Sequence, residues 1–160
     1  MDQVDRIIAQ WQTERPELET SPMALFGRLR RIADHLALEM EQLHARHGLS
    51  SAGFDVLATL RRAGKAARLT PSELMASTMV TSGTMTNRLD RLEAAGFISR
   101  QRNPADGRGF KVELTHKGFE VIEQAVEEHV ALQASLLISL GPSDQRTLDA
   151  LLKTWLAALE

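Results

Sequence analysis

The chain of 160 residues is 43% hydrophobic and 25% charged, which is typical of a globular protein with one packed domain and helical extensions. Without a long apolar run or an apolar leader, the sequence predicts no membrane span and no signal peptide. The lack of cysteine excludes a disulfide scaffold, a thiolate zinc site and cysteine-based redox sensing, so we expect a cytoplasmic protein.

Charge is unevenly distributed along the chain. The overall net charge is −2, but residues 88–117 carry a net charge of +3, whereas residues 118–160 are clearly acidic. Basic side chains are therefore concentrated in one segment, as expected for a nucleic-acid-binding element on an acidic helical body.

Two helices are predicted before residue 50. Residues 2–14 form an amphipathic helix in which Val4, Ile7, Ile8 and Trp11 share one face. After a linker at residues 16–22, Pro22 opens a long helix that runs to about His47. A helix of this length indicates that part of it serves as an interface.

Two shorter helices follow. Ser50 or Ser51 caps the first, which has an apolar face that includes Phe54 and Leu57. Residues 70–73, Thr-Pro-Ser-Glu, have the capping-box pattern and start the second helix, which continues to about Met79.

Residues 81–115 predict a helix followed by a β-hairpin. Thr81 or Ser82 caps the helix, Met85, Leu89 and Leu92 form one apolar stripe along it, and Gly96 ends it. Strands from Phe97 and from Phe110 enclose the turn dipeptides Asn103-Pro104 and Asp106-Gly107. With the preceding helix, this pattern is typical of a winged helix-turn-helix, which places a helix in the DNA major groove.

Two C-terminal helices are predicted at residues 115–141 and 142–159, and both are rich in apolar positions. Thr115 is the predicted cap of the first. The terminal helices carry more apolar surface than one small domain covers, so we expect a C2 homodimer. The predicted fold is mainly α with a small β-wing: a winged helix (50–115) between dimerisation helices (22–48 and 116–160), preceded by an extra helix at residues 1–15. Two copies predict a pseudo-palindromic DNA site with half-sites roughly 10 bp apart.

Candidate DNA contacts lie in the helix and at the tip of the wing. Thr84, Thr86, Asn87 and Arg91 are candidates for the major groove, since Asn pairs with adenine and Arg with guanine or phosphate. Ser82 and Thr84 are alternatively placed to bind a phosphate at the helix N-terminus. Arg108, at the predicted tip, is expected to contact DNA.

The sequence carries no constellation of catalytic residues. It has no G-x-S-x-G, H-E-x-x-H, P-loop or GxGxxG motif. His44, His47 and Glu41 have a spacing that a metal site could use, but such pairs are common on helices. We therefore expect no enzyme activity, no metal and no cofactor.

Three segments together resemble the MarR family of winged-helix regulators. They are Leu69–Leu74, the helix ending RLDRLEAAGFI, and Asp106-Gly107-Arg108 followed by Leu114-Thr115 and Gly118. The resemblance covers about residues 22–160. It implies a dimeric repressor in which the wing arginine, Arg108, enters the minor groove.

The N-terminal helix extends the resemblance to the urate-responsive subgroup of this family. The ligand set of that subgroup matches Trp11, Asp55, Arg88 and Arg100. Urate or a related purine is the implied effector, and another small anion (aconitate, citrate or an aromatic acid) is the alternative. Each residue also has a plainer interpretation: a DNA contact for Arg88, a phosphate contact for Arg100, a salt bridge for Asp55 and packing for Trp11.

Overall fold

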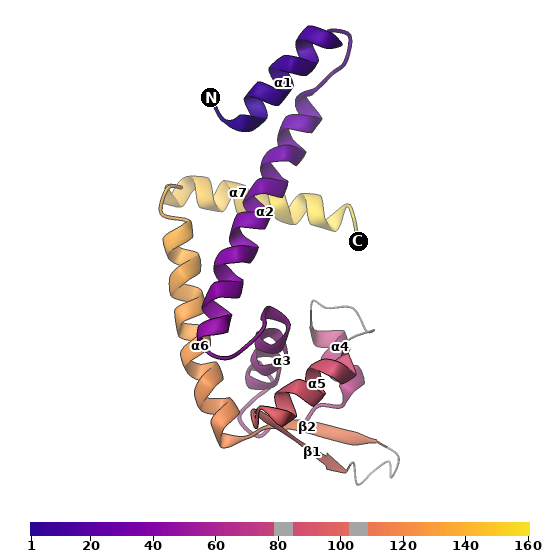
Figure 1. Ribbon diagram of the computed structural model, residues 1–160, viewed down its shortest axis with the longest axis vertical. Coiled ribbons are helices and arrows are strands. Elements are labelled where there is room, and N and C mark those ends of the chain that lie inside the picture. The colour runs from indigo at the N-terminus through magenta and orange to yellow at the C-terminus, as the bar shows by residue number, and fades with distance from the viewer. Residues whose placement is uncertain (79–84, 103–108) are drawn as a thin grey trace.

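The computed structural model describes residues 1–78, 85–102 and 109–160. Helices α1 to α7 and a two-stranded antiparallel sheet are arranged as an elongated molecule (Figure 1). The fold is mainly α with a small β-wing, as predicted. The bounds are α1 Gln3–Glu14, α2 Ser21–Arg46, α3 Ser51–Arg62, α4 Pro71–Ser77, α5 Met85–Ala94, β1 Ile98–Arg102, β2 Phe110–Leu114, α6 His116–Leu136 and α7 Pro142–Ala157.

The hydrophobic core lies in the winged-helix part of the molecule. It is built by α3, α4, α5, the hairpin and the first half of α6, and its apolar side chains are almost completely shielded from solvent. The innermost members are Val56, Leu57, Leu74, Leu89, Val112 and Ile122. A bridge between Leu69 and Val112 attaches the segment before α4 to the edge of the hairpin. This core fixes α5 and the wing to one body.

Short polar side chains start the helices as the sequence predicted. The hydroxyls of Ser50 and Thr115 accept from the backbone N–H groups of Gly53 and Gly118, and Thr70 and Glu73 form a complete capping box. Gly96 ends α5 with a φ of 76°, a conformation that glycine adopts without steric cost. The cap predicted at Thr81 or Ser82 and the turns at Asn103-Pro104 and Asp106-Gly107 lie outside the described residues.

Helices α2 and α6 connect the winged helix to the far end of the molecule, where α7 crosses α2 (Figure 1). The sequence predicted that helix α6 continues to Gly141, but the helix ends at Leu136. The side chain of Gln145, at the start of α7, donates hydrogen bonds to the carbonyls of Leu137 and Leu140. It thereby satisfies backbone acceptors in the turn between the two helices.

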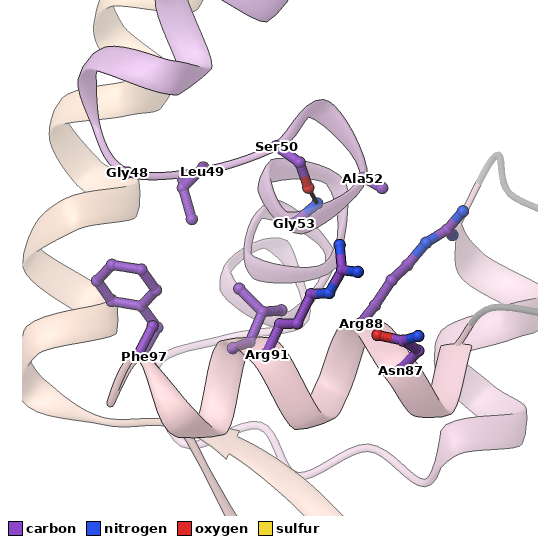
Figure 2. A pocket seen from close by; sticks show the side chains of 11 residues that line it. Gly48, Leu49, Ser50, Ala52, Gly53, Asn87, Arg88, Arg91 and Phe97 are labelled. Carbon is purple, nitrogen blue, oxygen red and sulfur yellow. Dashed lines mark hydrogen bonds between the residues drawn. The ribbon is translucent and has the colours of Figure 1, made fainter.

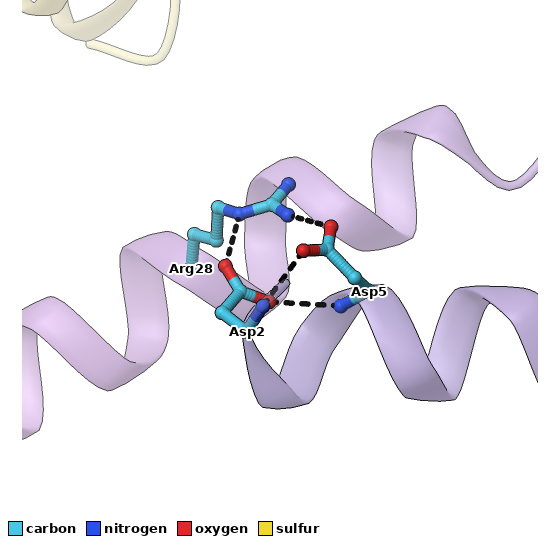
Figure 3. A network of polar contacts seen from close by, with 3 residues as sticks. All are labelled: Asp2, Asp5 and Arg28. Atoms are coloured by element: carbon cyan, nitrogen blue, oxygen red, sulfur yellow. Dashed lines mark hydrogen bonds and ion pairs between the residues drawn. The ribbon is translucent and has the colours of Figure 1, made fainter.

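Helix α1 packs along the N-terminal half of α2 through charged and apolar contacts. Arg28 of α2 bridges the carboxylates of Asp2 and Asp5, while Asp2 and Asp5 also cap the start of α1 (Figure 3). Beneath this network Val4 is buried against Gly27, where an added Cβ would lie 3.2 Å from Val4. The backbone N–H of Asp5, and then Arg28, lower the pKa of Asp2.

No helix in the described ranges has both the length and the apolar character that a bilayer crossing requires.

Candidate functional site

Helix α5 buries one face and presents a polar face to solvent. Met85, Leu89 and Leu92 are buried in the core, at the spacing that the sequence predicted. The side chains of Thr86, Asn87 and Arg91 are exposed on other faces of the helix. The structure therefore leaves these three predicted DNA contacts accessible. The other three, Ser82, Thr84 and Arg108, lie outside the described residues, so their roles remain predictions.

A cavity of about 340 Å³ lies between α5 and the start of α3. Figure 2 shows the side chains of Arg88 and Arg91 rising from α5, with the guanidinium of Arg91 nearer to α3. The wall consists of Gly48, Leu49, Ser50, Ala52, Gly53, Asn87, Arg88, Arg91, Leu92, Ala95 and Phe97. Two guanidinium groups and the amide nitrogens at a helix N-terminus favour a negatively charged ligand in such a cavity.

Of the four residues in the predicted ligand set, Arg88 lines this cavity. Its side chain is partly buried, and its Nη1 atom is shielded from solvent without a hydrogen-bond partner among the described residues. A buried donor without a partner costs free energy, and a charged donor costs more than a neutral one. An anion that accepts from this nitrogen would remove that cost.

Arg100 lies on β1 and faces two carboxylates of α5. It forms ion pairs with Asp90 and with Glu93, whose Oε2 atom lies 3.3 Å from the Arg100 Nε atom. Its guanidinium also lies over the ring of Phe110 on β2, 4.9 Å from the ring centre. Arg100 is therefore ion-paired within the chain, but its Nε atom, like Nη1 of Arg88, is shielded from solvent without a hydrogen-bond partner among the described residues.

Asp55 and Trp11 do not join Arg88 in the cavity wall. Asp55 lies on α3 and is partly buried. Trp11 lies on α1, which packs on α2 at the opposite end of the molecule from α5 and the wing (Figure 1). Within one chain, the four residues of the predicted ligand set are thus not brought together.

A stack of aromatic rings that the sequence did not predict joins α2, α3 and α6. The ring of His44 lies 4.0 Å from that of Phe54, and the ring of His129 lies 4.7 Å from Phe54 on a nearly parallel plane. His44 Nδ1 is 3.0 Å from the Ser51 hydroxyl, and its Nε2 is 3.2 Å from His129 Nδ1.

The surroundings of this stack disfavour a charged imidazole. Burial, followed by the neighbouring His129 and His47, lowers the pKa of His44 to about 4, and burial also lowers the pKa of His129. Among the described residues, no group of three or more His, Asp or Glu side chains is arranged to hold a metal. The stack is therefore a neutral packing element.

Comparison with known proteins places this architecture in a family. The MarR family profile matches residues 47–109. The regulator PecS of Dickeya dadantii is 37% identical over 150 residues, covering 94% of this chain and 90% of PecS. The multiple antibiotic resistance protein MarR of Escherichia coli is 37% identical over 106 residues, covering 66% of this chain and 72% of MarR.

Solved structures agree with the sequence comparison. A mutant MarR from E. coli, in complex with operator DNA, superposes with a TM-score of 0.73 and 31% identity. The match covers 86% of this chain and 97% of that one. The proteins compared here are transcription regulators and not enzymes. The chain thus belongs to the MarR family of DNA-binding transcriptional regulators.

Proposed function

We propose that the protein is a homodimeric repressor that binds a pseudo-palindromic operator and is released from it by a small anion. Urate or a related purine is the preferred effector, and another small anion such as aconitate, citrate or an aromatic acid is the alternative. The observation that carries the effector part is Arg88 of the recognition helix α5, which lines the cavity and has a buried Nη1 atom without a hydrogen-bond partner among the described residues.

The accessible side chains of α5 support the DNA-binding part. Thr86, Asn87 and Arg91 are exposed on a helix that is rigidly backed by the core. In the related MarR structure from E. coli, the protein is bound to operator DNA. We extend this binding mode to α5 in the major groove and to Arg108 at the tip of the wing.

Exposed apolar side chains support the dimer. The face shared by α2 and α7 includes Phe26, which packs edge-on against Trp155, and a groove of about 580 Å³ beside them. Leu25 and Leu151 are 58% and 63% exposed. A continuous apolar surface of this kind is typical of a protein–protein interface. A second copy would cover it, and the two recognition helices would then face two half-sites.

An anion at Arg88 would couple ligand binding to DNA binding because Arg88 belongs to the recognition helix itself. If Arg100 also binds the anion, it must first leave Asp90 and Glu93. Trp11 lies at the far end of the same chain, so its participation requires the second copy or a movement of α1. A coupling free energy of ~1–3 kcal/mol would change DNA affinity 5- to 150-fold.

The test uses the whole 160-residue chain and fluorescence anisotropy with a duplex selected from a random-sequence pool. Affinity for the duplex should fall steeply with salt, because phosphate contacts release counterions. Urate, xanthine, hypoxanthine, citrate and aconitate are then added in turn, and urate should weaken binding most. An affinity that does not change with salt would refute the DNA-binding part.

Single substitutions distinguish the loss of the effector site from a general loss of folding or DNA binding. Arg88→Ala should reduce the response to urate, whereas Arg30→Ala, which removes an exposed arginine paired with Asp34, should leave it unchanged. A full response in Arg100→Ala and Asp55→Ala would exclude both residues from the ligand set. A dimer should appear in sedimentation analysis and be weakened by Leu151→Glu, which places a charge on the exposed apolar face.

A further inference from the structure

Arg100 is the point at which the recognition helix meets both strands of the wing. From β1 it forms ion pairs with Asp90 and Glu93 on α5, and its guanidinium covers Phe110 on β2. Arg100 and Phe110 belong to the same end of the hairpin, since Phe110 pairs with Arg102 in the antiparallel register. We call these four side chains, Asp90, Glu93, Arg100 and Phe110, the Arg100 cluster.

The burial of Arg100 distinguishes this cluster from an ordinary surface ion pair. The side chain of Arg100 is 22% exposed, whereas those of Asp90 and Glu93 are 58% and 42% exposed. Exposed ion pairs contribute little because solvent screens them and the side chains lose entropy. Here the aromatic ring holds the planar guanidinium in place, so less freedom is lost when the carboxylates bind it.

The carboxylates also stand on an element that must approach DNA. Negative side chains on a recognition helix repel phosphates, and their removal ordinarily strengthens binding. Asp90 and Glu93 therefore oppose DNA binding through their charge and can favour it only through the geometry that they impose. Removing the two negative charges therefore shows whether Asp90 and Glu93 weaken or strengthen DNA binding overall.

We infer that Arg100 is a positioning residue that sets the wing relative to α5, and that Asp90 and Glu93 favour DNA binding through it. With α5 in the major groove and the wing on the adjacent backbone, a change in the angle between them would weaken both sets of contacts. This inference rests on the proposed DNA-binding function and adds to it the contact that holds the two DNA-binding elements in register.

The decisive variant is the double substitution Asp90→Asn with Glu93→Gln. It removes two negative charges near DNA, yet we expect it to lower operator affinity about tenfold, because Arg100 loses its partners. Arg100→Ala should cause a loss of similar size. Combining all three substitutions should cost no more than Arg100→Ala alone, since residues that act as a unit are not additive.

The salt dependence of binding separates positioning from direct contact. If Arg100 only positions the wing, Arg100→Ala lowers affinity without changing the slope of log affinity against log salt. A phosphate contact would instead reduce the slope by about one. Arg100→Lys, which keeps the charge but not the planar fork, should recover only part of the affinity.

Glu120→Gln is the matched control, since Glu120 is an exposed acid that pairs with His116 within α6. It should bind the operator like wild type, and circular dichroism should show that every variant is folded. Unchanged or stronger binding by the Asp90/Glu93 double variant, or a reduced salt slope in Arg100→Ala, would overturn the positioning role. If the wild-type protein binds no duplex, the proposed function itself fails and this inference fails with it.

Discussion

Acidification should destabilise the protein between pH 6.5 and pH 4 because of the buried ring of His44. The residue His44 is 3% exposed, and burial lowers its pKa from 6.5 to about 4 in the folded protein. The unfolded chain therefore takes up a proton near pH 6.5, while the folded chain remains neutral until about pH 4. The stability that the neutral His44 contributes is fully present above pH 6.5, its pKa in the unfolded chain. This contribution is lost as the pH falls toward about 4, the pKa in the folded protein.

The size of the effect follows from these two pKa values. Between pH 8 and pH 5, the uptake of a proton by the unfolded state alone lowers the free energy of unfolding by about 2 kcal/mol. His129, whose pKa is also lowered, changes stability in the same direction. Carboxylates with lowered pKa values, such as Glu128, lose their contribution mainly below their ordinary pKa of 4.5, so they change stability little between pH 8 and pH 5.

Urea denaturation at one fixed protein concentration, at pH 8 and at pH 5, measures this difference. His44→Gln keeps a polar group near the Ser51 hydroxyl but cannot titrate, so the pH dependence should shrink to the part that His129 supplies. His116→Gln is the control, because the side chain of His116 is almost fully exposed. If His44→Gln and wild type lose the same free energy of unfolding between the two pH values, the burial of His44 does not make stability depend on pH.

Three substitutions test the packing that supports the site. Gly118→Ala places a Cβ 1.9 Å from the Phe97 carbonyl oxygen and should cost about 3 kcal/mol in urea denaturation. Gly141→Ala, whose Cβ would have its nearest neighbour at 3.7 Å, should cost no more than about 1 kcal/mol, the usual cost of alanine at a helix N-cap. Thr59→Val should be neutral or stabilising in thermal melting, because the buried Thr59 hydroxyl has no hydrogen-bond partner in the described part of the chain; a loss above about 1 kcal/mol would reveal a partner. Arg61→Ala removes a partly exposed ion pair with Glu123 and should lower the free energy of unfolding by no more than about 1 kcal/mol, and by less at high salt. Equal losses at low and high salt would argue against an electrostatic origin.

Features that depend on neighbouring residues were predictable from the sequence. The capping box of Thr70 and Glu73, the caps Ser50 and Thr115, and the stop at Gly96 need only local backbone geometry and side-chain chemistry. The apolar spacing of α5 likewise identified its buried face. The fold class therefore followed from local signals that agree with one another.

Features that depend on distant residues were not predictable in the same way. His44 and His129 are separated by 85 positions, and their stacking depends on how α2 and α6 meet. No periodicity in the sequence indicates that Arg100 reaches back from β1 to Asp90 on α5. The turn after the early end of α6 accepts hydrogen bonds from Gln145, a side chain that lies beyond this turn in the sequence.

The end of α5 and the start of α6 share a set of close contacts. The Thr115 hydroxyl donates to the Gly96 carbonyl, the Lys117 ammonium donates to the Ala95 carbonyl, and Gly118 leaves no room for a side chain against Phe97. These contacts leave the joint little freedom to bend, so α6 acts as a lever arm for the recognition helix. In the proposed dimer, a small tilt of α6 would be converted into a change in the separation of the two recognition helices, and hence into a mismatch with the helical repeat of DNA.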